Sequence, residues 1–224
     1  MKSKIPTYNG ILRGHSLSVP EAVYKCTGIN IFGKRIKSLV FSTDVAIIKN
    51  INTDAVLCVY PFTPQPLVAQ ALISVSDVPV FVGVGGGLTK GIRAVRLAEY
   101  AEHQGAFGVI VNAPIKPEII SEIKKRVELP VLATIVSIKQ DIKERIEAGA
   151  DILNIAASYN TPEVIKYVKS FNKKIPIIAT GGPSDDTIMQ TIEAGANAIT
   201  YTPPSNAEIF AKSMQEYRER YYTN

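Results

Sequence analysis

The sequence predicts an α/β protein whose core is a compact (β/α)8 barrel. Eight short apolar runs rich in Val and Ile alternate with stretches of helical periodicity, as expected of strands buried on both faces of a parallel sheet. Residues 130–150 also recur 46 positions later, with nine of 21 residues identical and no gap. A repeating strand–helix–strand–helix unit favours a closed barrel. A doubly wound open sheet, which reverses its strand order midway, is the alternative.

The predicted elements follow one another without a break from residue 38 onwards. The strands are Ser38–Thr43, Ala55–Phe62, Pro79–Val84, Phe107–Ala113, Pro130–Val136, Asp151–Ala157, Pro176–Gly181 and Ala198–Thr202. A turn or two of helix is expected at Val45–Asn50. Longer helices are expected at Gln65–Ser76, Lys90–Gln104, Lys116–Glu128, Lys139–Ala148, Pro162–Phe171, Asp185–Ala194 and Asn206–Arg220. Strands three, five and seven begin with Pro, which is tolerated at the first residue of a strand although it lacks an N–H group. Strands four, six and eight follow a Gly-Ala pair, and the Gly of each pair ends the preceding helix.

Length and charge divide the chain into two parts. A folded chain of 224 residues and 24.3 kDa buries roughly 70% of its extended surface, so one core needs no disulfide or metal to stabilise it. Residues 1–37 carry seven basic residues and one acidic residue, a net charge of +6, whereas the other 187 carry 18 basic and 19 acidic, a net charge of −1. We therefore expect a basic N-terminal extension, residues 1–37, with a helix near Pro20–Cys26, followed by the barrel, residues 38–224. The extension is either a solvated segment or an attractor for an anionic ligand or an acidic partner surface.

Composition excludes several classes of protein. No aromatic residues are interleaved with the basic ones, so no nucleic-acid partner is expected. No run of 18 uncharged apolar residues and no apolar leader occur, so we expect neither a membrane partner nor secretion. The two cysteines, Cys26 and Cys58, show no metal or disulfide spacing, and His15 and His103 are the only histidines. This pattern predicts a cytoplasmic protein without a metal site.

The loop after strand seven is the first candidate site. In barrels of this kind the chemistry lies at the carboxyl ends of the strands. Thr180, Gly181, Gly182 and Ser184 precede a helix start at Asp185. Glycine permits a close approach of the backbone, and the N–H groups of a helix start favour an anion. We therefore expect phosphate binding there, with a simple tight turn as the alternative.

Of two further candidate segments, one would extend this site and the other would compete with it. Ser205 has capping-box spacing to Glu208 and would present a second helix start, although the prolines before it donate few N–H groups. Gly85, Gly86, Gly87 and Lys90, in the loop after strand three, form a competing anion cradle. Their spacing matches neither the dinucleotide fingerprint nor the P-loop. The loop either contacts a ligand or is a flexible turn.

Acid–base residues are scarce at the predicted strand ends. Asp44 is the one carboxylate placed there, and it is either a general base or the N-cap of the following turn. Asn112 is an amide in an apolar strand, and it either contacts substrate or is hydrogen-bonded internally. No strand contains lysine and no Gly-x-Ser-x-Gly elbow occurs, which disfavours Schiff-base and serine-hydrolase chemistry. His15 would reach the mouth of the barrel only if the extension folds over it.

Two stretches near the C-terminus carry a family resemblance. Ile178-Ala-Thr-Gly-Gly-Pro183 and Ile192-Glu-Ala-Gly-Ala-Asn-Ala198 resemble the last two strands of phosphate-binding barrels such as N-acetylmannosamine-6-phosphate epimerase, thiamine phosphate synthase and thiazole synthase. The resemblance implies that Gly181 and Gly182 bind phosphate. With Phe32–Asp44 and Ile199–Ser205, the whole chain is similar to a bacterial family of short barrel proteins labelled generically as hydrolases. No metal-ligand set or activated nucleophile in these residues supports that label, and the epimerase's strand-end lysine and glutamate have no counterpart here.

These observations predict an enzyme acting on a small phosphorylated metabolite, as an isomerase, epimerase or lyase. A non-catalytic barrel that binds or senses such a metabolite is one alternative, and a generic hydrolase is another. No cofactor is expected, with FMN as the alternative because flavin phosphates use similar glycine loops. Self-association of the chain is left open.

Overall fold

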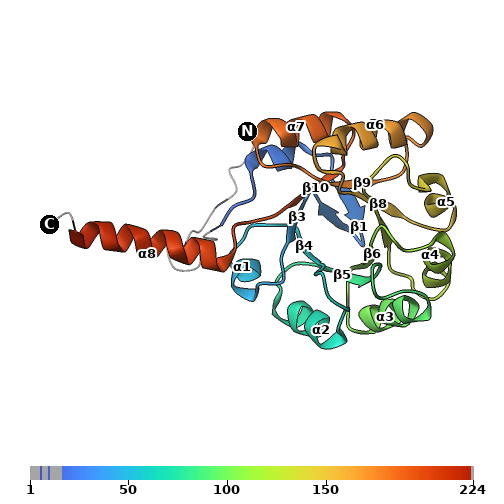
Figure 1. Ribbon diagram of the computed structural model, residues 1–224, viewed down its shortest axis with the longest axis horizontal. Helices are drawn as coiled ribbons and strands as arrows, with labels where there is room; N and C mark the ends of the chain where they lie inside the picture. Colours follow the sequence, from blue (N-terminus) through green and yellow to red (C-terminus); the bar gives the residue numbers. More distant parts are fainter. Residues whose placement is uncertain (1–5, 7–9, 11–16, 223–224) are drawn as a thin grey trace.

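The computed structural model describes Pro6, Gly10 and residues 17–222. Eight parallel strands close into a barrel in which each strand pairs with the next along the chain and β10 pairs with β3 (Figure 1). The strands are β3 (Ser38–Phe41), β4 (Ala55–Cys58), β5 (Val80–Gly85), β6 (Gly108–Val111), β7 (Val131–Ile135), β8 (Ile152–Ile155), β9 (Ile177–Thr180) and β10 (Ala198–Tyr201). The predicted (β/α)8 barrel is confirmed.

Helices follow the strands of the barrel, and each lies where the periodicity predicts one, although several are shorter than expected. They are α1 (Val45–Lys49), α2 (Pro66–Val75), α3 (Ile92–His103), α4 (Pro117–Lys124), α5 (Ile142–Glu147), α6 (Thr161–Phe171), α7 (Asp185–Glu193) and α8 (Asn206–Tyr222), with a short 3₁₀ helix η2 (Ser158–Asn160) before α6. The helix-ending glycines behave as predicted. Gly105, Gly149 and Gly195 have φ of 87°, 106° and 117°, a conformation that favours glycine.

A short hairpin closes the end of the barrel opposite the strand carboxyl ends. Strands β1 (Ile29–Ile31) and β2 (Lys34–Ile36) pair antiparallel, and the turn at Phe32 and Gly33 has positive φ at both residues. Ile29, Ile31 and Ile36 are buried in one cluster with the interior residues of the barrel. The hairpin thus acts as the floor of the barrel interior.

A 3₁₀ helix, η1 (Glu21–Lys25), lies where a helix near Pro20–Cys26 is predicted. The segment 17–26 packs between α7 and α1. Its Leu17 exchanges backbone hydrogen bonds with Asn50 and Asn52, just after α1, and η1 contacts α7. Val23 and Cys26 are buried in the cluster that joins the strands to the helices. His15 and the basic residues before it lie outside the described residues.

Helix α8 does not complete the ring. It extends away from the barrel as a single helix, with no other element beside it (Figure 1). In a (β/α)8 barrel the last helix packs between the first and the seventh. Here residues 17–26 occupy that place.

Candidate functional site

At the carboxyl end of the barrel, one inward-facing residue from each strand contributes to a ring at the base of the mouth, which we call the mouth floor. The interior cluster contains the residue two positions earlier on each strand, for example Leu132, Ile152 and Ile178. Side chains alternate along a strand, so the next inward positions lie at the mouth. This mouth floor consists of Phe41, Val59, Gly83, Asn112, Thr134, Asn154, Thr180 and Thr200.

The half of the mouth floor from β7 to β10 is polar but uncharged. Thr134, Asn154 and Thr200 are buried, and Thr180 is half-buried. Asn154 Nδ2 donates a hydrogen bond to Thr134 Oγ1 at 3.2 Å. Thr200 Oγ1 is buried and has no hydrogen-bond partner among the described residues. A buried hydroxyl normally finds a partner, so this one is available to a ligand.

The opposite half of the mouth floor contains a small hollow, lined by Val59, Tyr60, Phe62, Pro64, Gly83, Gly85, Gly86 and Asn112. Glycine is required here by close packing. A Cβ on Gly83 would lie 3.2 Å from the side chain of Val59, and a Cβ on Gly85 would lie 2.6 Å from that of Ala94. Gly86, with φ of 115°, lies directly against Asn112. The glycine loop therefore shapes the hollow.

The remainder of that loop is a tight turn. The backbone groups of Gly86 and Thr89 bond to each other in both directions, at 2.9 and 3.3 Å. Gly87 has positive φ with open space around it, and Lys90 is exposed. The turn explains why glycine is needed at positions 86 and 87, where φ is positive. The role of Lys90 in anion binding stays a prediction.

The glycine pair after β9 lies beside the polar half of the mouth floor. Gly181 N–H makes a long 3.5 Å contact with Thr200 O, whereas Gly182 N–H has no backbone acceptor among the described residues. Of the two N–H groups, only that of Gly182 is therefore open to a ligand. A Cβ on Gly182 would lie 2.6 Å from Thr187 Oγ1, at a φ of 87°. A larger residue at position 182 would therefore strain this loop.

Both predicted helix starts are capped by side chains. Ser184 and Thr187 form a capping box at the start of α7, so a hydroxyl and not a carboxylate caps this helix. Ser205 donates from its N–H and its hydroxyl to Glu208 Oε2, both at 2.7 Å. These hydrogen bonds lower the pKa of Glu208 and keep a carboxylate at the start of α8. The carboxylate of Glu208 disfavours an anion at the start of α8, so the start of α7 is the better candidate for an anion site.

Asp44 and Asn112 lie at different points of the rim. Asp44 is the N-cap of α1, and its Oδ1 accepts hydrogen bonds from the N–H groups of Ala46 at 2.8 Å and Ile47 at 3.3 Å. The capping alternative is thus realised, and a role as base stays a prediction. The Asn112 side chain lines the hollow and makes no hydrogen bond to any described residue. Its amide is therefore free to contact a ligand, as one of the two alternatives requires.

Sequence reasoning missed Asn154 and Thr200. Each is a polar residue inside an apolar strand, the same signal that identified Asn112. Their strands were read as uniformly buried, so neither was considered as a ligand contact. Side chains alternate along a strand, so counting two residues on from each interior residue places both on the mouth floor.

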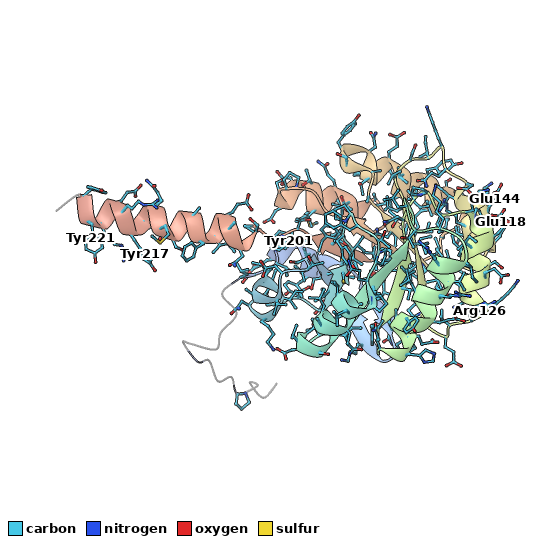
Figure 2. The ribbon with its side chains drawn as sticks, turned by 60° about the horizontal axis from the view of Figure 1, so that its bottom comes forward. Glu118, Arg126, Glu144, Tyr201, Tyr217 and Tyr221 are labelled. Atoms are coloured by element: carbon cyan, nitrogen blue, oxygen red, sulfur yellow. The ribbon has the colours of Figure 1, made fainter. Side chains whose placement is uncertain are left out.

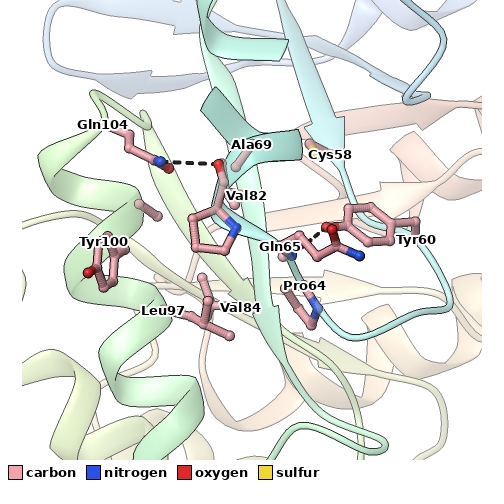
Figure 3. Close-up of a pocket in the computed structure, with 13 residues that line it drawn as sticks. Cys58, Tyr60, Pro64, Gln65, Ala69, Val82, Val84, Leu97, Tyr100 and Gln104 are labelled. Atoms are coloured by element: carbon pink, nitrogen blue, oxygen red, sulfur yellow. Dashed lines mark hydrogen bonds between the residues drawn. The ribbon is translucent and has the colours of Figure 1, made fainter. Parts of the chain in front are cut away.

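A second hollow lies outside the barrel wall, between α2, α3 and the strands β4 and β5 (Figure 3). Its walls are largely apolar, with Cys58, Leu97 and Tyr100 among them. Gln104 Nε2 donates to Pro66 O at 3.1 Å, and Tyr60 accepts from the backbone N–H of Gln65 at 2.7 Å, while Gln104 Oε1 is buried without a partner among the described residues. This hollow lies outside the barrel wall, whereas barrels of this kind have their chemistry at the mouth. We therefore assign the candidate site to the mouth.

The described residues contain neither a metal-ligand cluster nor a membrane-spanning helix. No three His, Cys, Asp or Glu side chains there are grouped so that they could hold a metal ion. No helix in that part of the chain is both long and apolar enough to cross a membrane. Burial raises the pKa of the Cys26 and Cys58 thiols to about 11, so neither is an activated nucleophile.

Comparison with known proteins bears on the fold. No family model matches the sequence. A thiamine-phosphate synthase of Anoxybacillus flavithermus is 24% identical over 123 residues, which are 50% of this chain and 55% of that protein. The chain therefore matches about half the length of this relative. The expected resemblance to phosphate-binding barrels is thereby supported.

Solved structures give the same fold over most of the chain. Phosphonopyruvate hydrolase in complex with oxalate and Mg²⁺ has a TM-score of 0.62 at 13% identity, covering 89% of this chain and 83% of that one. Phosphoenolpyruvate phosphomutase from Streptomyces platensis subsp. rosaceus has a TM-score of 0.58 at 16% identity, covering 83% and 81%. An aldolase has a TM-score of 0.55 at 20% identity, covering 74% and 88%. At these identities the likeness establishes the fold.

Proposed function

We propose that the chain is an enzyme that takes a small phosphorylated metabolite at the mouth floor and acts on it as an isomerase, epimerase or lyase. The observation that supports this most is the unpartnered, buried hydroxyl of Thr200 beside the Gly181–Gly182 loop. Gly182 N–H and the hydroxyls of Thr180 and Thr200 are neutral donors on neighbouring strands, suited to phosphate oxygens. The rest of the ligand would lie over the mouth floor, where the Asn112 amide beside the glycine-lined hollow is available to it.

Replacing Thr200 with valine tests the ligand site. Valine has the shape of threonine, and the hydroxyl it removes has no partner in the protein, so stability should change by less than about 1 kcal/mol. Loss of a hydrogen bond to a charged phosphate should weaken binding about tenfold or more. Thermal-shift titrations with thiamine phosphate, ribose 5-phosphate and FMN measure both effects.

Thr191→Val is the matched control for this experiment. Thr191 is also buried, but it lies on α7, and its hydroxyl donates to Thr187 O at 2.9 Å. This variant should lose some stability and keep its affinity. Equal affinity of Thr200→Val and the unaltered chain for a ligand that binds would contradict the proposed site.

Asp44→Asn separates catalysis from capping. Asparagine caps a helix as well as aspartate does, so α1 should keep its start, but an amide cannot accept a proton as a base. For a phosphorylated substrate found in the ligand screen, we expect turnover to fall at least about 100-fold with binding unchanged. Asp44→Ala, which removes the cap, should also lower stability by about 1 kcal/mol.

The scarcity of carboxylates at the mouth supports one competing function, a barrel that binds a metabolite without converting it. Asp44 is already engaged as a cap, and the mouth floor itself carries no charged side chain. Binding without turnover by the unaltered chain, or full turnover by Asp44→Asn, would count against the catalytic role assigned to Asp44. The first result would favour the binding function.

A further inference from the structure

Helix α8 is a large exposed element with no place on its own barrel. It spans 17 residues, none of them buried, and it leaves the barrel as a single projection (Figures 1 and 2). The gap between α7 and α1 is filled by residues 17–26, with Val23 and Cys26 buried there. α8 therefore cannot pack back into the ring without displacing a buried segment.

One face of α8 carries a continuous apolar stripe. Phe210, Met214, Tyr217 and Tyr221 are spaced four, three and four residues apart, which places them in a row on one side of a helix. Phe210, Tyr217 and Tyr221 are 66%, 52% and 86% exposed. Figure 2 shows Tyr217 and Tyr221 on the same side of the helix. Phe, Met and Tyr are the side chains enriched where proteins associate.

We propose that this stripe pairs with the same stripe of a second copy of the chain, with the two helices antiparallel. The spacing of four, three and four reads the same from either end, so a twofold axis between Gln215 and Glu216 brings the stripe onto itself. Phe210 of one copy then faces Tyr221 of the other, as an aromatic pair. Met214 faces Tyr217, as a sulfur–aromatic contact.

The charges of α8 select the antiparallel arrangement. Arg218 and Arg220 lie on the two flanks of the stripe. About the proposed twofold axis, Arg218 faces Ser213 and Arg220 faces Ala211, so no like charges meet. In a parallel pair each arginine would face its own counterpart. Three basic and three acidic residues make the helix neutral overall, which disfavours a polyanionic partner.

The area and the geometry suit a small helix–helix interface. At their observed exposures, the three aromatic side chains offer roughly 300–500 Å² per copy. Met214 and the flanking residues add to this area, which stays below the roughly 800 Å² that each partner contributes to a standard interface. A helix of 17 residues is about 25 Å long, so the antiparallel pair holds the two barrels at its opposite ends.

The mass of the full chain in solution tests the proposal. Light scattering or sedimentation between about 1 and 100 µM should give twice the 24.3 kDa of the chain. Tyr217→Ser removes two central rings per dimer and should raise the dissociation constant at least about 100-fold. Gln215→Ser, a matched change on the opposite face, should leave the dimer intact. Far-UV circular dichroism should show both variants folded.

Three results would overturn the proposal: a monomer at every concentration, a dimer that survives Tyr217→Ser, or a dimer that Gln215→Ser dissociates. A monomer whose stripe is nevertheless protected from solvent labelling would point instead to residues 1–16 of the same chain as the partner.

Disulfide cross-linking tests the arrangement. Chains carrying Met214→Cys and Tyr217→Cys are mixed and treated with a mild oxidant. Cys26 and Cys58 are buried, and their raised pKa keeps them unreactive. The antiparallel pair should give chiefly the mixed disulfide between the two variants. Cross-links within each single variant and none between them would show a parallel pair and overturn the antiparallel arrangement.

Discussion

Replacing Phe81 with alanine is expected to lower the free energy of unfolding by about 4 kcal/mol. Phe81 is fully buried in the barrel interior. Its ring meets Phe107 edge to face at 5.8 Å, and Phe107 meets Phe32 of the β1–β2 hairpin in the same way at 5.3 Å. Truncation leaves a cavity between hydrogen-bonded strands that cannot move together to fill it. It also weakens the contact between the barrel and the hairpin.

Urea denaturation with a two-state fit measures this loss. Phe62→Ala is the matched control, because Phe62 is 73% exposed and the same truncation there should change stability by less than about 0.5 kcal/mol. Phe81→Leu should lose only part of the 4 kcal/mol because it fills most of the space. Equal losses for Phe81→Ala and Phe62→Ala would show that the interior is not packed as described.

Replacing Arg145 with methionine is expected to cost about 3 kcal/mol of stability. Arg145 on α5 is 3% exposed, and its Nη2 donates to Ala113 O at 2.7 Å and to Ile115 O at 2.6 Å. Its Nε donates to Asp141 Oδ1 at 3.0 Å. Methionine keeps the aliphatic packing but leaves two carbonyls in the loop after β6 without this donor. Asp141 also loses its ion pair.

The same arginine fixes the loop that carries Asn112, so the variant should also weaken ligand binding at the mouth. Arg126→Met is the control, because its 3.4 Å ion pair with Glu99 is exposed and contributes less than about 1 kcal/mol. Denaturant midpoints of the two variants, compared at the same pH and salt, measure the difference. Similar small losses for both would mean that Arg145 does not hold the loop.

Most of the fold could be predicted from the sequence because its signals are local or periodic. Runs of Val and Ile give strands buried on both faces, and the 46-residue repeat gives uniform strand–helix units that close into a barrel. Gly149 and Gly195, the ends of the repeated helices, adopt the positive φ that their position predicts. Capping chemistry is equally local, as at Ser205, where the capping box forms with the predicted partner.

The candidate site could be predicted in part. The strand-end rule led to Thr180, Gly182 and Asn112, which the structure places at the mouth. It did not lead to Asn154 or Thr200, because a strand read in isolation does not show which face looks inward once the barrel closes. Their contribution to a shared floor depends on residues from other strands.

The sequence by itself therefore determined the barrel and its strand order, and it predicts a candidate site at the carboxyl ends of the strands. The tertiary structure decided where the flanking segments go. The hairpin with Ile29 and Ile36 closes the opposite end of the barrel, since its apolar side chains bury best against the interior residues there. Residues 17–26 fill the gap between α7 and α1 by the same burial of apolar surface, and α8 is consequently excluded from it. Neither outcome has a local signal, because each depends on competition between distant segments for one apolar surface.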